Sequence, residues 1–159
     1  MMSVRLMSQE WADQISQMVD SWPDEQEKAD ERKTAAYWEW VNRKRREFSG
    51  TFALGIRSVP GAAGPQYVAF TFENEGACTG VAILDEAAAL SQAKLALECD
   101  YQTWVNMANG YEVSKAMMYH QLPLRVGGAT DVLRRVHFLA ELITVALRPQ
   151  TELPEAAAV

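Results

Sequence analysis

The sequence predicts an α+β fold, and three features of the chain support this. Apolar residues recur at helical spacing towards both ends, whereas they alternate with polar residues in the middle. Turn signals at residues 60–65 and 74–76 separate three alternating segments, which therefore form a meander of two consecutive hairpins. The expected order is two helices, three strands, a fourth strand, two short helices, a fifth strand and a closing helix.

Length and composition predict one globular domain. Of the 159 residues, 48% are apolar and 23% are charged, so a sizeable core can form. No linker rich in proline, glycine or serine divides the chain, and we expect a single domain over residues 1–149 with a disordered tail over 150–159. The net charge of −6 disfavours a general attraction to nucleic acid, so no nucleic-acid partner is expected.

The first predicted helix begins after Ser8, a suitable N-cap, and ends at Pro23. Its apolar stripe consists of Trp11, Ile15, Met18 and Trp22. The segment Asp24–Lys33 that follows is almost wholly charged. We interpret this acidic connector as solvated and assign it no role.

The second helix is predicted over Thr34–Phe48, with Gly50 as its C-terminal cap. It contains the basic run Arg43–Arg46. Four consecutive residues point around a helix rather than along one side, which favours a solvated face. Contact with acidic lipid headgroups or phosphates is the alternative interpretation.

Alternation predicts the strands. Phe52, Leu54 and Ile56 share one face of the first strand, and the second and third strands follow over Val68–Phe72 and Ala77–Leu84. An Ala-rich connection leads to a fourth strand over Gln92–Cys99. Its leucines face inward and its Gln92, Lys94 and Glu98 face outward, which predicts a strand with one wet face.

The remaining elements are three helices and one strand. Asp100 is the expected N-cap of a helix ending at Gly110, and a short helix follows over Glu112–Tyr119. A strand is predicted over Gln121–Gly128, and Pro123 suits either an edge strand or the first residues of a strand. The closing helix runs from Thr130 or Asp131 to Leu147 and is apolar around most of its circumference. Such a helix is buried, meets a partner, or forms the wall of a cavity.

No motif for catalysis is present in the sequence. A nucleophile elbow, a dinucleotide fingerprint and a His-Glu-x-x-His motif are all missing, so we expect no catalytic residue, cofactor or metal. His120 and His137 are interpreted as ordinary histidines, and Cys78 and Cys99 as free thiols. The alternative is a pocket enzyme acting on an apolar thioester or steroid, with a carboxylate as general base. Its candidate bases are Asp85, Glu86 and Asp100.

The first residues contain no apolar core of a signal peptide, and no apolar run approaches the length of a membrane span. We therefore expect a cytoplasmic protein.

Three stretches of the chain resemble the sterol carrier protein type-2 (sterol-binding domain) family in its standalone bacterial form. Met7–Asp13 is similar to the opening helix of small bacterial members, and Asp100–Gly110 to a stretch with an acidic residue, an aromatic, an apolar pair and a glycine. Ser114–Gly128 resembles the family's helix–strand–glycine ending. One departure is His120-Gln121, where the family usually has a small glycine before the last strand.

The resemblance implies a twisted, five-stranded, mainly antiparallel sheet covered by helices and enclosing an apolar cavity. It also implies non-catalytic binding and intracellular transfer of a sterol, fatty acid, acyl-coenzyme A or phospholipid. Transient membrane contact and a homodimer are compatible with this role. An interaction module for a lipid-metabolising enzyme, built on the closing helix, is a further alternative.

The predicted ligand site lies between the last three helices. Methionines beside a tryptophan are usually core filler, but they also suit pockets that accept variable apolar ligands. The closing helix, which is apolar around most of its circumference, is expected to form the opposite wall of this pocket. The predicted ligand-binding residues are Trp104, Met107, Met117, Met118, Val136, Leu139 and Ile143.

Overall fold

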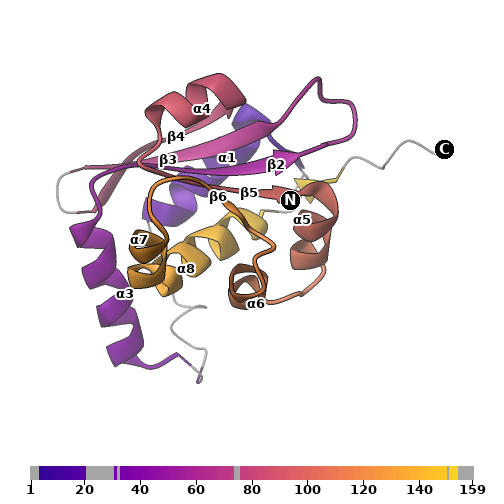
Figure 1. Ribbon diagram of the computed structural model, residues 1–159. Helices are drawn as coiled ribbons and strands as arrows, with labels where there is room; N and C mark the ends of the chain where they lie inside the picture. The colour runs from indigo at the N-terminus through magenta and orange to yellow at the C-terminus, as the bar shows by residue number, and fades with distance from the viewer. Residues whose placement is uncertain (1–3, 21–30, 32, 74–75, 150, 154–159) are drawn as a thin grey trace.

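A computed structural model describes residues 4–20, 31, 33–73, 76–149 and 151–153, and a five-stranded sheet forms its centre (Figure 1). In spatial order the strands are β4 (Ala77–Asp85), β3 (Gln66–Glu73), β2 (Gly50–Arg57), β5 (Leu95–Asp100) and β6 (Leu124–Val126). Neighbouring strands are antiparallel except β2 and β5, which are parallel. The predicted meander and the mainly antiparallel sheet are therefore confirmed. Strand β6 lies at an edge, but it is shorter than the predicted Gln121–Gly128 and begins after Pro123.

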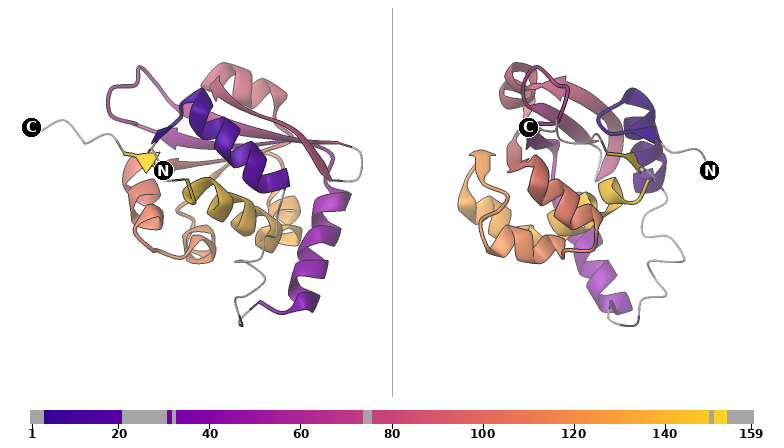
Figure 2. Two further views of the ribbon diagram at one scale, coloured as in Figure 1. Left: turned by 180° about the vertical axis from the view of Figure 1, so that it is seen from behind. Right: turned by 90° about the vertical axis from the view of Figure 1, so that its right-hand side faces the viewer.

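Helices lie on both faces of this sheet (Figures 1 and 2). They are α1 (Gln9–Asp20), α3 (Ala35–Glu47), α4 (Glu86–Gln92), α5 (Tyr101–Ala108), α6 (Val113–Met118), α7 (Ala129–Arg134) and α8 (Val136–Leu147). Two short strands, β1 (Val4–Arg5) and β7 (Thr151–Glu152), pair in parallel as a second sheet. Strand β7 lies within the segment 150–159 that was predicted as a tail.

The main core lies between one face of the sheet and α8. The register places Phe52 opposite Phe70 and Leu54 opposite Val68, so these large side chains share the face predicted from their alternation. They are fully buried together with Phe138 of α8. Helices α1, α3, α6 and α7 surround α8. The closing helix is apolar on most sides because most of its sides are covered.

The opposite face of the sheet carries a smaller core under α4. It consists of Ala53, Tyr67, Ala69, Ala89 and Ala96. The prediction of a plain connection was wrong here, because Asp85 caps α4 by accepting a hydrogen bond from the Ala88 N–H. The seven-residue helix buries only Ala89 and shows no apolar stripe, so periodicity does not reveal it.

The wet face predicted for the fourth strand was also wrong. Strand β5 begins at Leu95 rather than Gln92, and residues 95–99 are all buried. Ala96 belongs to the small core under α4, and Glu98 is enclosed by side chains described below. A central strand with both faces covered loses the solvated side that its alternation indicates.

The predicted closing helix is two helices in the structure. Arg135, between α7 and α8, has a non-helical backbone with φ −119° and ψ 17°. Neither glycine nor proline marks this break in the sequence, and the apolar pattern continues across it. The sequence therefore predicted one helix instead of two.

Several predicted helix ends are confirmed and two are wrong. The helix start expected at Thr130 or Asp131 lies at Ala129, after the N-cap Gly128. The Ser8 hydroxyl accepts a hydrogen bond from the Trp11 N–H, and the Asp100 carboxylate accepts one from the Thr103 N–H. The C-cap of α3 is Phe48 rather than Gly50, because the chain enters β2 directly and Gly50 is its first residue. Trp22, Pro23 and most of the acidic connector lie outside the described residues.

His120 lies where the resemblance described above implies a glycine. His120 adopts φ 59°, in the left-handed region that glycine enters without strain. Its side chain is exposed and does not enter the core.

Candidate functional site

A cleft of about 550 Å³ lies between α8, the start of α3 and the segment from the end of α5 into α6. Its apolar lining comes from Met107, Tyr111, Val113, Ala140 and Leu147. Its polar lining includes Lys33, Tyr37, His137, Glu141 and Thr144. A mostly apolar hollow with a few convergent polar groups is the usual form of a small-molecule site.

Glu141 is the central polar residue of the cleft. Its side chain is only 7% exposed, on a helix whose other buried residues are apolar. The Lys33 ammonium lies 2.8 Å from Oε1, and the Tyr37 hydroxyl donates to the same oxygen at 2.7 Å. The carboxylate is therefore satisfied by two residues more than a hundred positions away in sequence, as a buried charge requires.

Aromatic rings surround this carboxylate. Tyr37 packs edge-on against both Trp38 and His137, and Trp40 also packs against His137. Burial, followed by the hydrogen bond to Glu141, raises the pKa of Tyr37 well above its usual value. Tyr37 therefore stays protonated and acts as a fixed donor to the carboxylate.

A second buried carboxylate, Glu98, lies on the α4 side of the sheet and is 1% exposed. It accepts hydrogen bonds from the Tyr67 hydroxyl and from Arg125, whose Nη1 lies 2.9 Å away. Arg57 lies 3.6 Å from the same carboxylate. This cluster joins β2, β3, β5 and β6 and does not line the cleft, so we assign it a structural role.

The structure brings one of the seven predicted ligand residues, Met107, into the lining of the cleft. Trp104, Leu139 and Ile143 are buried in the main core and do not line the cleft. Met117 is partly buried, and Val136 is half-buried at the first turn of α8. Met118 is 71% exposed.

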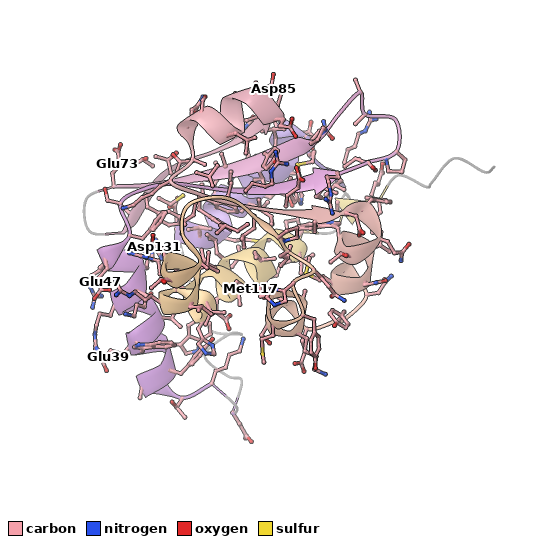
Figure 3. All side chains as sticks on the ribbon, viewed as in Figure 1. Glu39, Glu47, Glu73, Asp85, Met117 and Asp131 are labelled. Atoms are coloured by element: carbon pink, nitrogen blue, oxygen red, sulfur yellow. The ribbon has the colours of Figure 1, made fainter. Side chains whose placement is uncertain are left out.

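The candidate bases of the alternative enzyme lie elsewhere. Asp85 caps α4 on the opposite side of the sheet from Met117 (Figure 3). Glu86 pairs with Arg125, and Asp100 caps α5. Hydrogen bonds from Thr103 lower the pKa of Asp100, which makes it a weaker base. None of the three residues lines the cleft.

The two thiols differ in burial. Burial raises the pKa of the Cys99 thiol to about 12, and it also raises that of the half-buried Cys78. Within the described ranges, no group of three or more His, Cys, Asp or Glu side chains could hold a metal ion. None of the helices in this part of the chain has the length and apolar character needed to cross a bilayer.

The polar end of the cleft was not predicted from the sequence. Glu141 is the single carboxylate within an otherwise apolar run from Val136 to Leu147, and this isolation was the available signal. Lys33 carried no signal, since it ends a connector full of charges.

Comparison with solved structures identifies the fold. A crystal structure of sterol carrier protein 2 matches 91% of this chain and 99% of its own, with a TM-score of 0.67 and 21% sequence identity. A hypothetical protein of Thermus thermophilus, described as a candidate sterol carrier protein, matches 99% of this chain and 97% of its own. Its TM-score is 0.65 and its identity 20%.

These likenesses confirm that the chain has the fold of sterol carrier protein 2. Each match covers nearly the whole length of the solved structure. A scan of protein-family models found no match to the sequence, and a search of curated proteins found none either.

Proposed function

We propose that this protein binds an amphiphilic lipid-like molecule in the cleft between α3, α6 and α8 and carries it within the cytoplasm without catalysing a reaction. The observation that carries the proposal is the cleft itself. Its volume of about 550 Å³ and its mixed apolar and polar lining suit one small ligand. The fold of sterol carrier protein 2 adds support, because that protein's name describes a carrier of sterols.

The proposed site keeps the predicted residues in two layers. Met107 contacts the ligand, while Trp104, Leu139 and Ile143 form the apolar layer behind the cleft, into which an enclosed cavity would extend. Each methylene of a bound chain contributes about 0.8 kcal/mol when it leaves water. Met117 and Val136 flank this layer on α6 and α8, and Met118 makes no contact with the ligand in this proposal.

The structure gives less support to the two alternative functions, an interaction module and a pocket enzyme. An interaction module would present this apolar helix to a partner, but eight of its residues are buried within the chain. The pocket enzyme would need a base in the cleft, whereas its three candidate carboxylates are caps or ion-pair partners outside it. The carrier proposal includes transient contact with a membrane during loading, and a homodimer remains compatible with it.

Replacing Ser114 with tryptophan tests the cleft directly. Ser114 lines the cleft from α6 and is partly exposed, so a large ring can enter the hollow without displacing the core. We expect the affinity for Nile red, a neutral apolar dye, to fall about tenfold in a fluorescence titration.

The matched control is Ser91→Trp. Ser91 is exposed on α4, on the other face of the sheet, and the same ring there should leave dye binding unchanged. Equal affinity of the Ser114→Trp variant and the unmodified protein would refute binding in this cleft.

A further inference from the structure

We propose that the polar end of the cleft is a binding site for an organic ammonium group, which the ammonium of Lys33 fills in this structure. The inference rests on the proposed function and adds the charge of the ligand's head group. The ligand would then be an amphiphile with an amine at one end and an apolar chain at the other.

The fixed charge in this part of the cleft is negative. Glu141 is 7% exposed and belongs to the buried helix α8, which holds its carboxylate in the wall of the cleft. Lys33 is 30% exposed and precedes the first turn of α3. A long, flexible side chain of this kind can move its charge into water at little cost, whereas the carboxylate stays in the wall.

The surroundings of the Lys33 ammonium are those of a cation site. The nitrogen lies 2.8 Å and 3.1 Å from the two oxygens of Glu141, and 5.5 Å from the centre of the Trp38 ring. Tyr37 donates its only proton to Glu141 and so holds the carboxylate in place. Carboxylate oxygens and aromatic faces together attract any ammonium group, not only that of a lysine.

Exchange of charge favours a cationic head group over an anionic one. An incoming ammonium replaces that of Lys33 and leaves Glu141 paired. An anionic head group bound to Lys33 would have to draw it away from Glu141, and a buried carboxylate without its partner is strongly unfavourable. Glu112 and Arg148 also line the cleft with opposite charges, so together they do not change this preference.

Three amphiphiles with the same apolar chain but different head groups distinguish the contribution of the head group to binding from that of the chain. They are dodecylamine, dodecanoate and dodecanol. Calorimetric titration of the unmodified protein should show tighter binding of dodecylamine than of the other two. In Glu141→Gln, which keeps the shape of the side chain, binding of dodecylamine should weaken about tenfold, while that of dodecanol stays unchanged.

Removing the Lys33 ammonium, which competes for the site, should raise the affinity for dodecylamine. Lys33→Met should bind dodecylamine about tenfold more tightly, because the site no longer has to be vacated first. Lys44→Met is the control, since Lys44 pairs with Glu47 and does not line the cleft. If Lys33→Met fails to fold, as judged by circular dichroism, the Glu141→Gln titration decides alone.

Tighter binding of dodecanoate than of dodecylamine, or equal binding of dodecylamine by Glu141→Gln and the unmodified protein, would overturn the ammonium site. The proposed carrier function would survive either result provided that dodecanol binds. If the unmodified protein binds none of the three, the carrier function fails, and the ammonium site fails with it.

Discussion

Replacing Phe138 with alanine is expected to lower the free energy of unfolding by about 4 kcal/mol. Phe138 is fully buried at the first turns of α8. Its ring centre lies 5.6 Å from that of Phe72 and 6.1 Å from that of Phe48, so truncation leaves a cavity between the sheet, α3 and α8. Denaturation by urea, followed by circular dichroism, measures the loss.

Leu133→Ala is the matched control, because Leu133 lies on the neighbouring helix α7 and is 72% exposed. That variant should differ from the unmodified protein by less than about 0.5 kcal/mol. Similar losses in the two variants would show that α8 does not pack against the sheet as described.

Gly55→Ala should have the second largest effect, a loss of about 2 to 3 kcal/mol. A methyl group at Gly55 in β2 would overlap the ring of Tyr67, which lies directly opposite on β3. Displacement of Tyr67 would also break its hydrogen bond to Glu98 and leave one oxygen of that buried carboxylate without its donor. The same urea denaturation tests this.

Gly80→Ala provides the comparison within the same sheet. A methyl group at Gly80 in β4 would meet nothing within 4 Å, and we expect stability to stay the same or rise slightly. If the two variants are equally stable, the close contact between Gly55 and Tyr67 does not exist.

Local signals account for much of the fold. The alternation of Phe52, Leu54 and Ile56 identified both the strand and its inward face, and Ser8 and Asp100 marked two helix starts. Each of these signals is contained within a few residues of sequence. Side-chain direction in a strand and capping at a helix start depend on neighbours in the chain, so they can be predicted from it.

Features that depend on distant segments were missed. Helix α4 is held by the sheet beneath it and by the Asp85 cap, and its Ala-rich sequence carries no stripe of its own. Because α4 was not expected, the strand now assigned as β5 was given a wet face, and Glu98 was placed in solvent rather than beside Tyr67 and Arg125.

In the candidate site, too, local sequence signals predicted some residues, whereas contacts between distant segments were missed. Met107 was predicted as a ligand residue from its position near Trp104, and the structure places it in the lining of the cleft. The pairing of Lys33 with Glu141 joins residues 108 positions apart, and no local pattern specifies such a pair. The break at Arg135 also changes where α8 starts, and with it the setting of Val136.

The most direct test of the carrier proposal is native mass spectrometry of the purified protein after incubation with a total lipid extract. The proposal predicts a second mass above that of the chain, with one lipid bound, and its loss in Ser114→Trp. A spectrum that shows only the mass of the chain, at every ratio of lipid to protein, would contradict it.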